Sequence, residues 1–474
     1  MPFDSLTFLI FFFSVLAISN AIRAWTARKA FLLAASWLFY AAWNPPFVLL
    51  LMFSCTLDWW LAQRMASLSH LGDRLPWLRL SLTVNLGILA TFKYQYFILG
   101  NVAWSMERFG IPWQAPDMGL ALPVGISFYT FQSISYAIDV YRGRETPIRS
   151  WRDYSLYVAF FPQLVAGPIV RFHDMRVQLA QARGTTLPNL GVGISLMILG
   201  LFQKIVLADG IFAPVADAAY ADPAKVTALG AWVGTLAFAG QIFCDFAGYS
   251  TTAIGAARCL GFYLPLNFRF PYAAIGFSDF WRRWHISLST WLRDYLYISL
   301  GGNRLGRWLT LRNLLLTMLI GGLWHGAAWH FVIWGGLHGL WLVLERLLAD
   351  RGWFHVETAG RLGRTLWAGL TLVAVVYTWV WFRATDLDHA IAISRAFSDG
   401  AAFIAAWPSR DARDTMALLG FATIVAVHWA MRSSTAEDLI ARTPGPLIVA
   451  GLGLMSAAIV LSPGTSHAFI YFQF

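Results

Sequence analysis

Three histidines stand in a nearly uncharged apolar run, where an ionisable side chain is costly and is therefore a candidate for function. The run covers residues 313–344 and contains His325, His330 and His338. Glycines lie on both sides of His325 and allow a backbone or a ligand to approach closely. A neutral imidazole can take or give a proton near neutral pH. His325 is therefore the first candidate for acid–base chemistry. For His330 a structural hydrogen bond to a neighbouring helix is favoured, and His338 stays open between the two roles.

A zinc site is the main chemical alternative for these histidines. A metalloprotease needs the pattern HExxH, in which two histidines one helical turn apart enclose a glutamate. His325 and His330 lie five residues apart, and no glutamate stands between them. The sequence therefore predicts no metal centre at this position.

A second polar constellation lies in residues 278–304, SDFWRRWHISLSTWLRDYLYISLGGNR. It offers His285 as another possible proton acceptor. Its arginines, Arg282, Arg283 and Arg293, are suited to phosphate groups, which guanidinium binds in a bidentate manner. A donor such as coenzyme A carries several phosphates and arrives from the cytoplasm. The segment thus predicts a site for a phosphorylated cofactor, with contact to lipid headgroups as the alternative for the arginines.

The elements that must position these groups are unusual for a membrane chain. Residues 267–307 are too polar to lie in lipid, yet they are rich in aromatic side chains. Helical spacing would place Trp281, Trp284 and Leu288 on one side of a helix. We expect this segment to lie at the cytoplasmic face, partly sunk into the protein.

A second irregular stretch covers residues 154–171, YSLYVAFFPQLVAGPIVR. Pro162, Gly167 and Pro168 would interrupt a helix there. Broken backbone at membrane depth persists only where it is buried in protein or lines a wet cavity. The stretch predicts a re-entrant hairpin.

The amino-acid composition indicates the class of protein. Of 474 residues, 58% are hydrophobic and only 13% are charged, against about 25% charged in ordinary soluble domains. A soluble domain could not hide that much apolar surface, so the chain is predicted to be a polytopic membrane protein. The net charge of +10 fits arginines and lysines in cytoplasmic loops, and nucleic-acid binding is not expected.

Hydropathy predicts ten to twelve spans in one domain, several of them short or interrupted. The runs lie at 6–22, 31–43, 47–61, 80–102, 120–140, 190–207, 228–260, 311–323, 327–344, 366–382, 416–431 and 446–461. Basic loops at 23–29, 64–79 and 142–152 alternate with poorly charged ones, so the basic loops are predicted to be cytoplasmic and the N-terminus to lie outside. No cleavable signal peptide is evident.

A few further polar residues stand inside apolar runs. Lys204 and Asp209 close the run LFQKIVLAD, and Asp245 and Tyr249 lie in QIFCDFAGYS. Each favours a structural role over a catalytic one. The three cysteines show no metal-ligand spacing, and we expect buried free thiols.

Taken together, these motifs resemble the membrane-bound O-acyltransferase (MBOAT) family, in its bacterial branch that O-acetylates exported polysaccharides such as alginate. The matching pieces run from about residue 122 to 474, whereas residues 1–120 match only in hydropathy. They are LPVGISFYTFQSISYAIDVYRG, FFPQLVAGPIVR, LFQKIVLAD, QIFCDFAGYS, PYAAIGFSDFWRRWHISLSTWLRDYLYISLGGNR, GGLWHGAAWHFVIWGGLHG and the terminal FIYFQF. One departure is Thr251, which follows the GYS motif where the family commonly has Asp.

The resemblance implies a fold and two site residues. The family fold is a ring of helices around a thin central wall, with re-entrant and interfacial helices. The invariant histidine of the WHG motif maps onto His325, and the histidine of the RRWH motif maps onto His285. Trp284 and Trp324 would line the path of the acyl group, beside the donor-binding Arg282, Arg283 and Arg293.

The resemblance also implies an activity. The leading hypothesis is transfer of an acetyl group from a cytoplasmic thioester, with acetyl-CoA as the expected donor and no permanently bound cofactor, across a bacterial inner membrane. The acceptor would be an exported polysaccharide or a periplasmic relay protein. His325 would deprotonate the attacking hydroxyl or briefly carry the acyl group itself.

Two alternatives remain open at this point. D-alanyl transfer to teichoic acid is the nearer one, since it belongs to the same family. A proton-coupled transporter is the other, although no internal repeat of the kind common in transporters is found.

Overall fold

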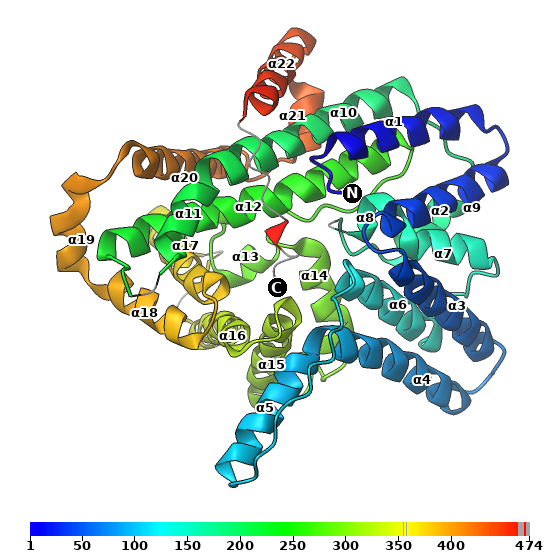
Figure 1. The fold of residues 1–474 in the computed structure, drawn as a ribbon, viewed down its shortest axis with the longest axis horizontal. Helices are drawn as coiled ribbons and strands as arrows, with labels where there is room; N and C mark the ends of the chain where they lie inside the picture. The colour runs from blue at the N-terminus through cyan, green and yellow to red at the C-terminus, as the bar shows by residue number, and fades with distance from the viewer. Residues whose placement is uncertain (166, 223, 354, 357, 463–468, 471–474) are drawn as a thin grey trace. The chain divides into compact units, whose positions relative to one another are not determined.

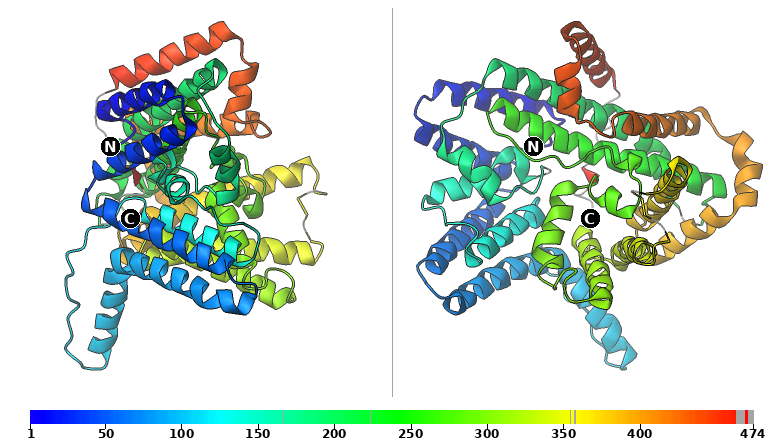
Figure 2. Two further views of the ribbon diagram at one scale, coloured as in Figure 1. Left: turned by 90° about the vertical axis from the view of Figure 1, so that its right-hand side faces the viewer. Right: turned by 180° about the vertical axis from the view of Figure 1, so that it is seen from behind.

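The computed structural model describes residues 1–165, 167–222, 224–353, 355–356, 358–462 and 469–470. Every regular element in these ranges is a helix (Figures 1 and 2), which confirms the all-α prediction. The chain divides into two compact units. The first comprises residues 1–194 and 253–265, and the second comprises residues 195–252 and 266–474.

Six helical stretches are long and apolar enough to cross a membrane, which confirms a polytopic membrane protein. Two shorter apolar helices are α1 (Leu6–Ala21) and α22 (Gly445–Leu461). The predicted ten to twelve spans also include helices that fall below this length or hydropathy, among them α2 (Trp25–Ala41) and α20 (Ala412–Ala430). The six stretches are α3 (Pro46–Ala66), α4–η1–α5 (Leu71–Leu89, Ala90–Tyr94, Gln95–Arg108), α10–η2–α11 (Leu187–Leu201, Phe202–Phe212, Ala213–Tyr220), α12 (Ala228–Cys259), α16 (Trp329–Asp350) and α17 (Arg361–Arg383).

In the first unit, α6 (Ile126–Tyr141) packs against α3 and α4, and the predicted break follows it. Helix α7 (Trp151–Ala159) ends one residue before α8 (Phe161–Leu164), and α9 (Phe172–Ala180) comes next. The backbone turns at Phe160, whose side chain is fully buried like that of Phe161. The broken backbone is therefore enclosed in protein, as irregular backbone in a membrane chain must be.

The basic loop after α1 is less solvated than its sequence suggests. Arg28 and Lys29 lie in α2 and are both buried. The Lys29 ammonium pairs with the Asp153 carboxylate of α7, and such pairing offsets the cost of burying a charge. These two cations hold elements of the first unit together.

In the second unit, two glycines set the distance between α10 and α12. A Cβ on Gly200 would lie 2.4 Å from the carbonyl oxygen of Gly248, and one on Gly248 would lie 2.6 Å from that of Gly200. Small residues allow such close helix contacts in membranes. The contact brings Lys204, on the π-helix η2, to 2.6 Å from an oxygen of Asp245 on α12.

The segment after α12 is divided into short helices, so the helical spacing of Trp281, Trp284 and Leu288 does not run along one continuous helix. It contains η3 (Pro271–Ala273), α13 (Phe277–Trp281), α14 (Ile286–Trp291) and η4 (Leu292–Tyr297). Residues 282–285 separate α13 from α14, and the last of them, His285, has a left-handed backbone with φ 43° and ψ 54°. The break is held by two backbone bonds, from Arg269 N–H to the Arg283 oxygen (2.9 Å) and from Ile286 N–H to the Asn267 oxygen (2.8 Å). Trp281, Trp284 and Leu288 are nevertheless all buried, as expected.

Helices α15 (Arg307–His325) and α16 form the tightest pair of the second unit. A Cβ on Gly335 would lie 2.2 Å from the Met318 oxygen, and one on Gly322 would lie 2.2 Å from the Phe331 oxygen. The glycines thus bring the two backbones into direct contact. The unit continues with α17, α18 (Leu387–Ser398), α19 (Gly400–Ala406), η5 (Trp407–Ser409), α20 and α21 (Ala436–Arg442).

Candidate active site

The two predicted catalytic histidines lie side by side in the second unit. His285 and His325 come from different helices, and their ring centroids are 6.3 Å apart. The Trp324 ring contacts both, at 6.1 Å from His285 and 4.9 Å from His325. Both histidines are buried, at 0% and 3% exposure. The fold therefore assembles a buried imidazole pair bridged by an indole.

His325 is held at a helix end by aromatic rings. It is the last residue of α15, and its ring lies 5.0 Å from Trp334 of α16 and 5.5 Å from Phe382 of α17. The chain then leaves the helix at Gly326, where a Cβ would overlap the Phe331 ring. This glycine is required because the backbone passes directly against an aromatic side chain. The orientation of the His325 ring is thereby restricted by three helices.

His285 owes its position to the backbone break. Its left-handed conformation directs the side chain toward α12, where the Phe246 ring lies 4.7 Å away. Burial away from water disfavours the charged imidazolium and lowers the pKa of His285 to about 3. The ring is therefore neutral at physiological pH and retains one nitrogen lone pair.

The other two histidines of the apolar run have structural partners. His330 Nδ1 is 2.9 Å from the carbonyl oxygen of Trp381, so this nitrogen donates to the end of α17. His338 Nε2 is 2.9 Å from the Thr378 hydroxyl, whose own proton goes to the Val375 oxygen at 2.7 Å. His338 Nε2 must then be the donor. Both contacts tie α16 to α17.

Two of the predicted donor-binding arginines line one cavity of about 730 Å³. Arg282 follows α13 and Arg293 lies on η4, and residues of the C-terminal part of α16 also line the cavity. Arg346 and His355 also line the cavity and were not singled out from the sequence. The carboxyl groups of Glu345 and Asp350 line the cavity as well, and Arg346 pairs with Asp350 at 2.9 Å. The three guanidinium groups are the lining groups suited to phosphates of a ligand.

Glu345 of α16 fixes the start of α13 beside this cavity. Its Oε2 accepts hydrogen bonds from the N–H groups of Phe277 (2.5 Å) and Ser278 (3.4 Å), the first residues of the helix. A carboxylate at a helix N-terminus satisfies N–H groups that have no partner within the helix. Glu345 therefore holds the segment that carries both Arg282 and His285.

Arg283 and Trp284 do not line the cavity. Arg283 Nε donates to Asp279 Oδ1 (3.0 Å), and Arg432 donates to Oδ2 of the same carboxylate (2.8 Å). Burial alone would raise the pKa of Asp279, but the Ile275 N–H and the two arginines lower it below its ordinary value. Trp284 is 1% exposed and packs against Phe280 and Trp379. Both residues stabilise the scaffold around α13.

Buried Asp245 of α12 contacts a C-terminal segment whose residues were not singled out individually from the sequence. Asp245 pairs with Lys204 through Oδ1 and accepts the N–H of Ile470 at Oδ2 (2.8 Å). Phe469 packs against Tyr249 at 4.6 Å and against Phe246, the ring that contacts His285. Only the overall motif FIYFQF marked this segment, and its residues 471–474 lie outside the described ranges.

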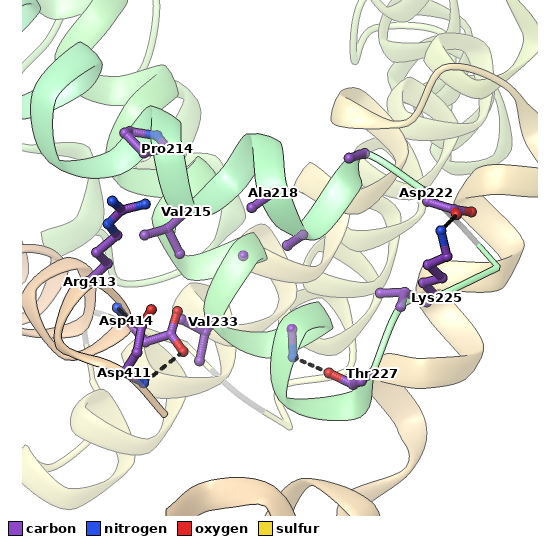
Figure 3. A pocket seen from close by; sticks show the side chains of 15 residues that line it. Pro214, Val215, Ala218, Asp222, Lys225, Thr227, Val233, Asp411, Arg413 and Asp414 are labelled. Atoms are coloured by element: carbon purple, nitrogen blue, oxygen red, sulfur yellow. Dashed lines mark hydrogen bonds and ion pairs between the residues drawn. The ribbon is translucent and has the colours of Figure 1, made fainter. Parts of the chain in front are cut away.

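A second cavity, of about 500 Å³, lies between α11, the start of α12 and the start of α20 (Figure 3). Small residues such as Ala218 and Gly230 line it, together with the Asp222–Lys225 ion pair (3.0 Å). None of the predicted site residues lines it. The histidine pair and the arginine-lined cavity are therefore the candidate reaction and donor sites.

Comparison with known proteins relates this arrangement to a known family. The sequence model of the MBOAT, membrane-bound O-acyltransferase family, matches residues 79–352, a range that includes both histidines and the three predicted arginines.

Three curated relatives illustrate the range of similarity. The chain is 42% identical over 394 residues to a probable alginate O-acetylase AlgI of Azotobacter vinelandii, covering 82% of this chain and 76% of that protein. It is 36% identical over 395 residues to a peptidoglycan O-acetyltransferase of Helicobacter pylori, covering 77% and 72%. It is 30% identical over 241 residues to a teichoic acid D-alanyltransferase of Streptococcus thermophilus, covering 47% and 56%.

Proposed function

The chain belongs to the membrane-bound O-acyltransferase family and is an O-acetyltransferase, and we propose that it acetylates hydroxyl groups of an exported polysaccharide. The acetyl group comes from a cytoplasmic thioester and crosses the membrane within the protein. It reaches the polymer directly or through a periplasmic relay protein.

The observation that carries this proposal is the meeting of His285 and His325 in one buried aromatic cluster. Excluding water from such a site protects a reactive thioester from hydrolysis and strengthens electrostatic interactions. The arginine-lined cavity is attached to the same segment, because Arg282 and His285 both follow α13. Donor binding and transfer thus use adjacent parts of one unit.

The reaction needs one proton acceptor and one proton donor. His325 accepts the proton of the attacking hydroxyl while that oxygen forms a bond to the thioester carbonyl carbon. The C–S bond then breaks, and the proton passes to the leaving thiolate, so that an ester and a free thiol result. His285 acts as a positioning residue, because its ring and that of His325 both contact Trp324.

The proposed donor is acetyl-CoA, and no permanently bound cofactor is required. Arg282, Arg293 and Arg346 line the cavity and match the phosphates of its nucleotide part. A thioester is already activated, so the protein mainly has to position the reactants and move a proton. Arg283 supports the site through Asp279 rather than through the donor.

The extent of the sequence similarity favours acetylation of a polysaccharide over D-alanylation of teichoic acid. The two O-acetyl-transferring relatives cover 82% and 77% of this chain, whereas the D-alanyltransferase covers 47%. We assign the protein to the bacterial inner membrane, with its N-terminus in the periplasm and the basic loops at 64–79 and 142–152 in the cytoplasm.

Transfer by purified protein tests the proposal. Protein in proteoliposomes is given acetyl-CoA with a labelled acetyl group and an oligosaccharide acceptor, and in a parallel sample a D-alanyl carrier protein. Labelled ester on the oligosaccharide, absent with the His325→Ala variant, is the expected result. Transfer from the D-alanyl carrier but not from acetyl-CoA would contradict it.

A further inference from the structure

Two arginines of the first unit share one tyrosine ring at a place that the proposed reaction does not use. The guanidinium carbon of Arg258 lies 3.9 Å from the ring centroid of Tyr263, and that of Arg183 lies 5.6 Å from the same centroid. Tyr263 is 43% exposed. The group therefore reaches the protein surface.

The ring is fixed in place by hydrogen bonds on all sides. Gln178 Oε1 accepts a hydrogen bond from the backbone N–H of Tyr263 (2.8 Å), and Gln178 Nε2 donates one to the backbone carbonyl oxygen of Tyr263 (2.9 Å). The Tyr263 hydroxyl donates to Asn189 Oδ1 at 3.3 Å. Both backbone groups and the side-chain hydroxyl are thus anchored, and the site is preorganised rather than a loose surface side chain.

Hydrogen bonds from one residue also connect the two segments that carry Arg183 and Arg258. Buried Arg28 donates to the carbonyl oxygens of Arg183 (2.9 Å) and Leu260 (3.2 Å). Gly261 has φ +88°, and a Cβ there would lie 2.8 Å from the Gly184 oxygen, so the two chains touch directly. Three cations consequently converge on one small region.

No acidic side chain balances these charges in the part of the chain that the structure describes. The guanidinium groups of Arg183 and Arg258 make no hydrogen bond or ion pair to any described residue, and the Nε of each is shielded from solvent without a partner. The aromatic contacts are attractive but leave both positive charges in place. Two half-buried guanidinium groups that contact the same ring are best satisfied by an anion with several acceptor oxygens.

The position points to the membrane surface as the source of that anion. Candidate spans α10–η2–α11 and α12 have one end each at this place, at Leu187 and Cys259. The ends of spans lie at the level of the lipid headgroups, and the phosphates of anionic lipids attract arginines there. A phosphate oxygen pair matches the fork of a guanidinium.

We propose that Arg183 and Arg258, arranged around Tyr263, form a binding site for a phosphate group, that of an anionic phospholipid headgroup. The site lies in the first unit and does not depend on the proposed acetyl transfer. Arg28 and Gln178 act as positioning residues, because they hold the segments that carry the two arginines and the ring.

Lipid retention by the full-length protein tests the site. Wild type and the double variant Arg183→Gln/Arg258→Gln are purified from membranes that contain phosphatidylglycerol, and the phospholipid that remains bound is identified by native mass spectrometry. We expect the double variant to lose roughly tenfold in bound phosphatidylglycerol, since charge-assisted bonds are removed. Retention of phosphatidylcholine should stay unchanged. Since neither guanidinium bonds to a described residue, both single variants should also fold and show part of the loss.

Arg108→Gln is the matched control, because Arg108 also lies over a ring, that of Trp104 at 4.8 Å, but has no second arginine on it. Thermal protection by a short-chain phosphatidylglycerol and by inorganic phosphate separates the two possible sources. Protection by the lipid alone assigns a headgroup, and equal protection by both assigns a soluble phosphate at the same arginines. Wild-type lipid retention by the double variant, or an equal loss with Arg108→Gln, would overturn the proposal.

Discussion

The ring centroids of His285 and His325 lie 6.3 Å apart in an edge-on arrangement, with an interplanar angle of 62°, and Trp324 contacts both rings. One histidine lies in a backbone break and the other at a helix end, so neither is part of a continuous helix surface. Each ring can therefore be directed into the space between helices. The pair is a defined target for mutation.

Replacing His325 should abolish transfer without unfolding the protein. His325→Ala removes the proposed proton acceptor, and such assistance is worth about 10²–10⁴ in rate. His325→Gln should be equally inactive, although it keeps more volume and a hydrogen-bonding group. The measurement is polymer acetylation at equal membrane abundance, with His330→Ala as a milder comparison. A His325→Ala variant that keeps more than about a tenth of wild-type transfer would remove the catalytic assignment.

Arg282 and Arg283 should give different phenotypes although they are neighbours in the sequence. Arg282→Gln and Arg293→Gln remove cations from the cavity, so each should raise the KM for acetyl-CoA while kcat and expression change little. Arg283→Gln breaks the bond to Asp279 and should lower thermal stability more than it raises KM. Steady-state kinetics and melting curves of the three variants distinguish these outcomes. Identical KM increases for all three would contradict the placement.

The pKa of His285 predicts a pH effect on stability. In the folded protein this pKa is about 3, against 6.5 for the ordinary side chain, so the unfolded chain binds the proton more readily. Stability is therefore unaffected above pH 6.5 and falls as the pH decreases below it, by about 2 kcal/mol at pH 5. His285→Gln should show a smaller decrease in melting temperature between pH 7 and pH 5. Parallel curves for the variant and the wild type would mean that His285 is not neutral and buried.

Sequence patterns located the helices and the reactive residue types but could not assign partners. The run 228–260 and the observed α12 agree within a residue, because a long apolar run permits only one kind of element in a membrane. The break at His285 was missed, because helical spacing alone suggested a continuous helix through Trp284. It depends on backbone bonds to Asn267 and Arg269, which are distant in the sequence.

The residues that line the arginine-lined cavity could not be assigned from sequence patterns either. Arg282 and Arg283 are neighbours at the end of the five-residue helix α13, and only Arg282 lines the cavity. The spacing of residues in the sequence does not reveal which of the two does so. Arg346 appeared as an ordinary basic residue at the end of an apolar run. Only the folded structure, in which α16 and η4 line the same cavity, makes Arg346 part of it.

The glycine contact between α15 and α16 should be intolerant of even one methyl group. Gly335→Ala would place a Cβ 2.2 Å from the Met318 oxygen, and relieving this overlap must separate the helices. Overpacking of this kind costs about 1–3 kcal/mol. Gly369→Ala on α17 is the control, because nothing lies within 4 Å of its Cβ position. Melting temperatures should fall for Gly335→Ala and stay equal or rise for Gly369→Ala.

Cysteine labelling checks the proposed orientation. The native Cys55, Cys244 and Cys259 are all buried, so an added exposed cysteine would be the reactive one. Ser69→Cys lies in a basic loop and should react with an impermeant reagent only after cells are opened. Gln114→Cys should react in intact cells. The reverse pattern would place the N-terminus in the cytoplasm.

The backbone contact at Gly322 and Gly335 also bears on how the protein moves during turnover. A slide of α15 along α16 by one helical turn, about 5.4 Å, would drive carbonyl oxygens into side chains on both helices. We therefore expect His325, at the end of α15, to keep its position relative to α16 during turnover. On this expectation the site is a fixed point to which the reactants move, unlike that of a carrier that rocks to expose its site alternately to each side.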